Sequence, residues 1–154
     1  MAGRSGRGAD PGHVIIQTYA PDHYVFQYLL GHDYKGFFKS EIEFRRALNY
    51  PPFSRLVNLC IDGPKADDVE TQAKKLAEIL RQKQGVNSKY REQIEILGPA
   101  PAPIMKLRGR YRWQMLLKGK QISALLEFAN TARELQPRSG KARLHIDVDP
   151  HSML

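Results

Sequence analysis

The residues with the most evident chemistry stand at the start of the chain, in the run Gly3-Arg4-Ser5-Gly6-Arg7. A guanidinium group stabilises negative charge on a transferring phosphoryl group, and glycine lets the backbone approach a phosphate closely. The run lacks the lysine of a Walker phosphate loop, and its glycines precede an expected strand, whereas a dinucleotide-binding loop follows one. The residue types alone therefore leave two interpretations, a flexible leader or part of a phosphate-contacting element.

A second candidate is the basic stretch at 101–120, which contains no acidic residue. Strand alternation would place Arg110 and Arg112 on one face of a hairpin, and Tyr111 and Trp113 on the other. Arginines on one face can follow nucleic-acid phosphates, and an aromatic ring can stack on unpaired bases, although core packing is favoured for Trp113. The alternative is a solvated edge whose charges only prevent pairing with another sheet.

A third group, His145, Asp147 and Asp149, shares one face of the last expected strand. Such a group could hold a metal ion, but polar residues at a period of two are also typical of the solvent face of an antiparallel strand. We favour the second interpretation and predict no metal site. Cys60 lies in the apolar run SRLVNLCIDG, has no catalytic partner in the sequence, and is expected in the core.

The 154 residues carry a net charge of +8, and 42% of them are hydrophobic. This composition supports one domain with appendages and favours an anionic partner such as nucleic acid, although a basic tail on an unrelated enzyme would give the same charge. One cysteine excludes an intrachain disulfide framework, and no stretch approaches the roughly 18 apolar residues of a membrane span. We expect a soluble, cytoplasmic protein without a signal peptide.

The first third of the chain is expected to form one strand and two helices. The β-branched run at 13–20 predicts a short buried strand, and the segment 22–31 has the cap, apolar stripe and glycine stop of a short helix. A second helix is expected to begin at the capping box at 40–43 and to end before the two prolines at 51–52.

From residue 54 onward the pattern alternates between strands and helices. Strands are predicted at 54–63, at 94–98, on both sides of 108–110 and at 142–149, helices at 64–84 and 121–135, and a loop at 86–93. This order, β-α-β-β-α-β, predicts an α+β fold of the ferredoxin-like type, with two helices on one face of an antiparallel sheet.

The opening run belongs to a longer stretch, AGRSGRGADPGHVIIQTYAPDH, that resembles the sixth motif of superfamily 2 nucleic-acid helicases and the strand after it. Residues 3–7 match the second half of the pattern Q-x-x-G-R-x-G-R, whose glutamine would stand before the first residue. The resemblance implies that Arg4 contacts the γ-phosphate region of ATP and that Arg7 is an arginine finger, in a cleft completed by a second motor lobe.

Three further blocks, YPPFSRLVNL, ILGPAPAPIMKLRGRYRWQMLLKG and IDVDP, are similar to the C-terminal end of the primosomal replication-restart helicases. The resemblance implies a C-terminal fragment with a helicase-lobe remnant at 1–37, a connecting helix at 38–53 and a ribosomal-protein-like DNA-binding domain at 54–154. It also implies that ATP, Mg²⁺ and Zn²⁺ serve the longer protein, while this chain holds no cofactor and does not hydrolyse ATP alone. The expected location is the bacterial cytoplasm, in association with the nucleoid.

The resemblance also implies partners. They are forked or single-stranded DNA, the acidic tail of single-stranded DNA-binding protein, other primosome proteins and the rest of the helicase core, with no membrane. We accordingly predict DNA contacts at Lys106, Arg108, Arg110, Tyr111, Arg112 and Lys118. Two alternatives stay open: an RNA-binding, ribosomal-protein-like module that uses the same basic hairpin, and a docking module for an acidic peptide.

Overall fold

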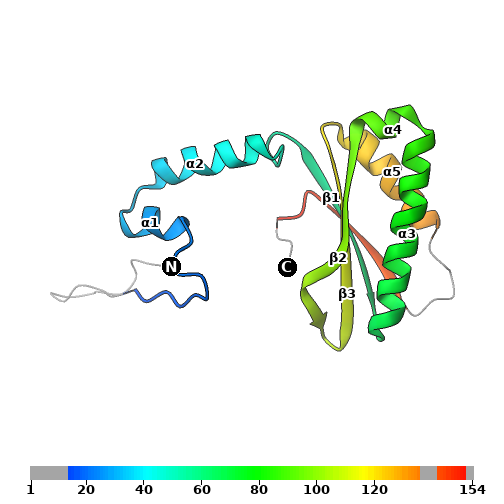
Figure 1. Ribbon diagram of the computed structural model, residues 1–154, viewed down its shortest axis with the longest axis horizontal. Helices are drawn as coiled ribbons and strands as arrows, with labels where there is room; N and C mark the ends of the chain where they lie inside the picture. Colours follow the sequence, from blue (N-terminus) through cyan, green and yellow to red (C-terminus); the bar gives the residue numbers. More distant parts are fainter. Residues whose placement is uncertain (1–13, 136–141, 152–154) are drawn as a thin grey trace. The chain divides into compact units, whose positions relative to one another are not determined.

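The computed structural model describes residues 14–135 and 142–151 (Figure 1). The chain divides into two compact units, Met1–Glu43 and Phe44–Leu154, and helix α2 (Tyr34–Ala47) runs across the division. Arg4 and Arg7 lie outside the described residues, so their contact with ATP stays a prediction. In the part of the chain that the structure describes, no helix is long and apolar enough to cross a membrane.

The first unit contains α1 (Val25–Leu30) and most of α2. The Asp33 carboxylate accepts a hydrogen bond from the Gly36 N–H at 2.9 Å, and α2 begins directly after Asp33. The prediction of a helix starting at the capping box at 40–43 is therefore wrong, because an earlier acidic residue satisfies the first free N–H groups of the helix.

The strand predicted at 13–20 is also wrong over its described part, because residues 14–20 form no regular secondary structure. The side chains of Val14 and Ile15 are 56% and 92% exposed. A strand needs a neighbour that satisfies its backbone N–H and C=O groups, and the described residues of this unit contain no other strand. A β-branched composition is therefore not sufficient here.

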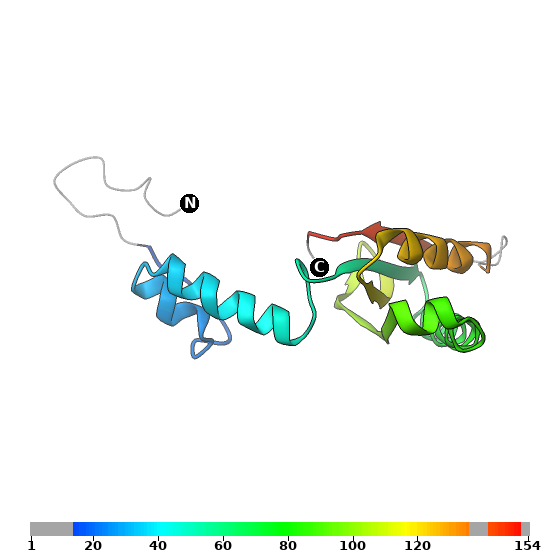
Figure 2. The ribbon, with the colours of Figure 1, turned by 90° about the horizontal axis from the view of Figure 1, so that it is seen from above.

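The second unit is a four-stranded sheet with helices on one face (Figure 2). All three neighbouring strand pairs are antiparallel, and the strand order is β2-β3-β1-β4. The elements are β1 (Arg55–Gly63), α3 (Ala66–Val86), α4 (Ser88–Gln93), β2 (Ile94–Leu107), β3 (Arg110–Gly119), α5 (Ile122–Glu134) and β4 (Arg143–Val148). The predicted α+β fold is confirmed, and its β-α-β-β-α-β order is observed with one added short helix, α4, between α3 and β2.

The loop predicted at 86–93 is wrong, because α4 forms there. The Asn87 side chain caps α4 by accepting a hydrogen bond from the Lys89 N–H at 3.0 Å. The ring of Tyr90 packs on Phe128 of α5, with ring centroids 4.9 Å apart. The segment is polar apart from Tyr90, so its sequence did not indicate that this one aromatic ring packs on α5 and holds the helix in place.

Strand β2 joins two segments predicted as separate strands, 94–98 and the one before 108–110, because it continues through the proline-rich PAPAP to Leu107. Its register with β3 shifts between Leu97 and Ala100, and again between Pro101 and Lys106. Since β2 lies at the edge of the sheet, prolines without an N–H are tolerated in it.

The core lies between the sheet and helices α3 and α5. Val57, Leu59 and Ile61 of β1 face these helices and are 0–1% exposed. Burial of each such side chain stabilises the fold by about 1.5–3 kcal/mol. Neither α3 nor α5 covers the opposite face, on which the alternate β1 residues lie; we call it the open face. Cys60 is buried as predicted, but on that face.

Candidate nucleic-acid interface

The predicted interface residues of strand β3 lie on two different faces of the sheet. Arg112 lies opposite Asp62 in the β1–β3 register, so Arg110 and Arg112 belong to the open face. Tyr111 and Trp113 face the helices and pack partly buried against the core, as predicted for Trp113. The alternation expected from the sequence is therefore confirmed.

The turn between β2 and β3 adds a third arginine to this end of the open face. Arg108 and Gly109 both have positive φ, 49° and 78°, as a two-residue hairpin turn of this hand requires. Arg108 is exposed, and the structure shows no hydrogen bond or ion pair between it and another described residue. Arg108, Arg110 and Arg112 together line a pocket of about 310 Å³ on the open face.

Asp62 organises the charge of this pocket. Its carboxylate accepts hydrogen bonds from Arg110 Nε and from His145 Nε2, the latter at 3.0 Å, and Arg110 Nη2 also donates to the Asp62 carbonyl at 3.1 Å. Burial raises the pKa of the Asp62 carboxyl, but the two hydrogen bonds outweigh it and hold that pKa below its ordinary value. Arg110 is thus engaged within the fold, while Arg108 is exposed at the hairpin turn.

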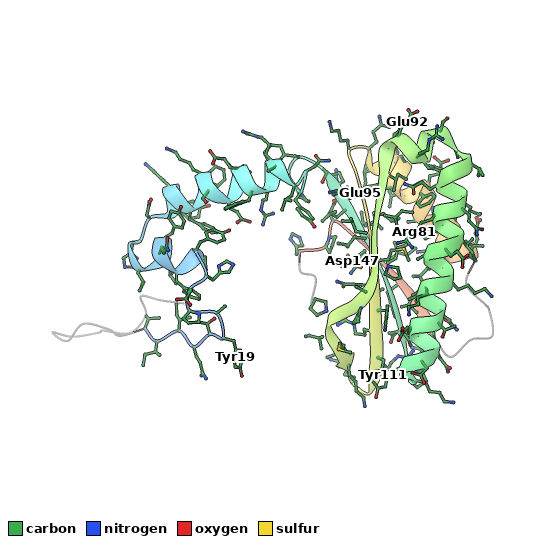
Figure 3. All side chains as sticks on the ribbon, viewed as in Figure 1. Tyr19, Arg81, Glu92, Glu95, Tyr111 and Asp147 are labelled. Carbon is green, nitrogen blue, oxygen red and sulfur yellow. The ribbon has the colours of Figure 1, made fainter. Side chains whose placement is uncertain are left out.

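The other predicted contacts lie elsewhere. Tyr111 lies close to the turn (Figure 3), on the helix-covered side of the sheet, and the Lys106 ammonium stands 4.8 Å from the centre of its ring. Lys118 is 8% exposed at the far end of β3, where its ammonium pairs with Glu95 at 2.7 Å and donates to the Leu48 carbonyl at 3.1 Å. The sequence grouped six residues, and three of them, Arg108, Arg110 and Arg112, line one pocket.

The group His145, Asp147 and Asp149 does not converge on one point. Asp149 accepts two hydrogen bonds from Arg55 Nε at 2.9 Å, which lower the pKa of its carboxyl, while His145 turns to Asp62. Within residues 14–135 and 142–151, no group of three or more histidine, cysteine or acidic side chains could hold a metal ion.

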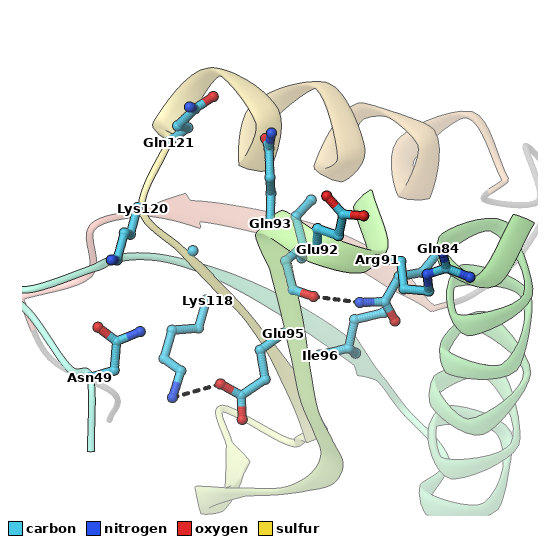
Figure 4. Close-up of a pocket in the computed structure, with 12 residues that line it drawn as sticks. Asn49, Gln84, Arg91, Glu92, Gln93, Glu95, Ile96, Lys118, Lys120 and Gln121 are labelled. Atoms are coloured by element: carbon cyan, nitrogen blue, oxygen red, sulfur yellow. Dashed lines mark hydrogen bonds and ion pairs between the residues drawn. The ribbon is translucent and has the colours of Figure 1, made fainter. Parts of the chain in front are cut away.

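A larger pocket, of about 670 Å³, lies at the opposite end of the sheet (Figure 4). It is built where α4 leads into β2 and where β3 leads into α5. Gln84 donates to the Ile94 carbonyl across it, and Lys118 pairs with Glu95 at its side. Arg91 and Lys120 are exposed cations of its lining, but two glutamates share that lining, so its charge is mixed.

Sequence reasoning missed two residues of the open-face pocket, Asn58 and Asp62. Asn58 is 6% exposed, and its Oδ1 atom has no hydrogen-bond partner among the described residues. The two residues are four positions apart, so they lie on the same face of an apolar strand. That spacing could have indicated a polar site, because buried polar groups cost free energy unless they are hydrogen-bonded.

The chain is similar in sequence to a known protein family. Residues 46–151 match the family model described as the primosomal protein N C-terminal domain. The chain is 39% identical over 153 residues to replication restart protein PriA of Synechocystis, 36% identical over 159 residues to that of Bacillus subtilis, and 32% identical over 157 residues to that of Haemophilus influenzae. These alignments cover 99–100% of this chain but only 17%, 19% and 20% of the three relatives. The resemblance predicted from the sequence is confirmed, and the chain belongs to the family of primosomal protein N C-terminal domains.

Proposed function

We propose that this chain is the DNA-binding module of a helicase that restarts replication at stalled or branched forks. The observation that carries the proposal is the convergence of Arg108, Arg110 and Arg112 around one pocket of the open face. Guanidinium groups bind phosphate oxygens with good geometry and release counterions from the nucleic acid when they do so. Since Asp62 engages Arg110, we assign the first phosphate contacts to Arg108 and Arg112.

Phosphate contacts of this kind carry affinity rather than sequence preference. They suit a protein that must bind forks or single strands wherever replication stops.

The remaining parts of the proposal rest on the likeness to replication restart proteins, which are much longer than this chain. ATP, Mg²⁺ and Zn²⁺ would serve the rest of the helicase, with Arg4 and Arg7 at the nucleotide, and this chain alone would be inactive as an enzyme. Its partners would include the helicase core and other primosome proteins, in the bacterial cytoplasm at the nucleoid.

The test is a binding titration of two variants that each lose two positive charges. One is Arg108→Gln with Arg112→Gln, and the matched control is Lys83→Gln with Arg133→Gln, which changes exposed residues of α3 and α5. Labelled forked DNA, single-stranded DNA, structured RNA and an acidic peptide are titrated at several salt concentrations.

The open-face variant should bind forked and single-stranded DNA more weakly than the control does. Its slope of log K against log salt should fall by about 1.4 on a single strand and about 1.8 on duplex DNA, since each lost phosphate contact removes about 0.7 or 0.9. Equal behaviour of the two variants would contradict the proposal. Tighter binding of structured RNA than of forked DNA would support an RNA-binding module instead.

A second candidate function is docking of an acidic peptide, such as the tail of single-stranded DNA-binding protein. The observation that favours it is the larger pocket, whose lining includes the exposed cations Arg91 and Lys120 (Figure 4). Lys120→Glu should then weaken binding of an acidic peptide, whereas Lys65→Glu, at the exposed residue before α3, should not. Unchanged peptide binding in Lys120→Glu would remove this candidate.

A further inference from the structure

We propose that the open-face pocket holds one unpaired nucleotide of a DNA strand, with a phosphate at its arginine end and a guanine base at the other. This inference rests on the proposed function, because it specifies what the same face binds. The pocket volume of about 310 Å³ is at the lower end of the range of about 300–1,000 Å³ that is usual for small-molecule sites. It therefore suits a single nucleotide better than a run of stacked bases.

The two ends of the pocket follow from the register of the sheet. Along β1 the floor runs from Asp62 through Cys60 to Asn58, a length of about 13 Å at roughly 3.3 Å per residue. Arg112 lies opposite Asp62 at one end, and Asp147 lies opposite Asn58 at the other. One end is thus rich in cations, and the other is rich in hydrogen-bond acceptors.

The acceptor end carries the observation that points to a ligand. Asn58 is 6% exposed, lines the pocket, and its Oδ1 has no hydrogen-bond partner among the described residues. Asp147 is exposed at the same end and makes no hydrogen bond or ion pair with another described residue. A buried acceptor without a partner is destabilising, so a ligand that donates N–H groups would relieve a cost already present in the fold.

The arginine end shows a complementary feature. Arg112 Nη1 is buried and has no hydrogen-bond partner among the described residues. A phosphate oxygen would accept from it, and Arg108 at the rim could donate to the same group. The ligand must therefore carry an anionic acceptor at one end and N–H donors at the other, which is the layout of a nucleotide.

The type of base follows from the pattern of donors. The Watson–Crick edge of guanine presents two adjacent donors, the ring N–H and the exocyclic amine, which match a carboxylate and an amide oxygen. Thymine presents one N–H between two carbonyl oxygens, and those oxygens would face the acceptors of Asn58 and Asp147. This edge is accessible only when the base is unpaired, so the site would read single-stranded DNA.

The test compares labelled (dT)₈ with the same octamer carrying one central dG, and uses dGMP and dTMP as competitors. The unmodified chain should bind the dG octamer at least about fivefold more tightly than (dT)₈, the effect of one good base contact. Asn58→Leu and Asp147→Asn should each lower the ratio of the affinity for the dG octamer to the affinity for (dT)₈. Asp147 is exposed, so its variant should fold even if Asn58→Leu does not.

Each outcome separates this inference from the proposed function. If the unmodified chain shows no preference for dG, the nucleotide site is refuted, and the proposed function still stands when Arg108→Gln with Arg112→Gln weakens binding of (dT)₈. A preference that survives both Asn58→Leu and Asp147→Asn would likewise overturn the assignment. Competition by dGMP but not dTMP would support it. Tighter binding of an (rU)₈ octamer with one rG than of the dG octamer would overturn the assignment to DNA.

Discussion

Replacement of Asp62 by asparagine should make the domain less stable and its DNA binding tighter. The Asp62 side chain is 15% exposed and bonds Arg110 of β3 and His145 of β4, so it joins three strands. Asparagine keeps one acceptor but loses the charge. Hydrogen bonds to charged groups contribute about 1.5–3 kcal/mol each, and asparagine retains part of this, so we expect a loss of about 1–2 kcal/mol. Thermal unfolding followed by circular dichroism should show a fall of about 5–10 °C.

The same change should make the Arg110 charge more available to DNA, because it removes the carboxylate charge beside the guanidinium while the Asp62 carbonyl still accepts a hydrogen bond from it. One additional phosphate contact would raise the magnitude of the salt slope by about 0.7 on a single strand. Asp67→Asn is the control, because it removes an equal charge from an exposed position in the first turn of α3. If Asp62→Asn binds DNA no more tightly than Asp67→Asn, the reasoning that Asp62 restrains Arg110 is refuted. A variant that is as stable as the unmodified chain would refute the structural half of the argument.

Three further changes test the core and the ion pairs. Phe128→Ala, at a fully buried ring, should lower the free energy of unfolding by about 3–5 kcal/mol in urea titrations. The pKa of the Asp149 carboxyl is lowered by hydrogen bonds from Arg55, so its stabilising effect is complete above the ordinary value of 3.8 and is lost as the pH falls through the lowered pKa. Asp149→Asn should therefore flatten the loss of stability below about pH 4. A hydrogen bond to Glu127 raises the pKa of Tyr90, and Glu127→Gln should return its titration, followed by NMR, toward 10.0.

The second unit could be predicted closely from the sequence because its pattern and its packing agree. The apolar residues of 64–84 recur at helical spacing, and α3 buries Val69, Ala73 and Leu80 of that stripe against the sheet. Similarly, the strand predicted at 54–63 is confirmed as β1, in which Val57 and Leu59 are fully buried. Such periodic segments need no distant partner to be recognised.

Two of the failures share a different cause, which is dependence on groups far away in the sequence. Residues 14–20 have strand composition, but a strand exists only with a neighbour. Helix α4 has polar composition, but the contact of Tyr90 with Phe128 on α5 anchors it. A stretch of local sequence does not show whether residues 14–20 have a partner strand, or that Tyr90 contacts Phe128.

In the candidate site, the sequence likewise does not show which positive side chains are paired within the fold. Lys118 and Arg108 look equivalent in the sequence, as cations of one basic hairpin, and the net charge counts them alike. In the fold, Lys118 is held by Glu95 and the Leu48 carbonyl, whereas Arg108 stands exposed at a turn whose positive φ values carry it beyond the end of the sheet. An ion pair inside the fold lowers the charge available to a phosphate at that point. The electrostatic attraction of DNA depends on which cations a fold leaves unengaged, and we therefore assign the proposed interface to the hairpin turn rather than to the whole of β3.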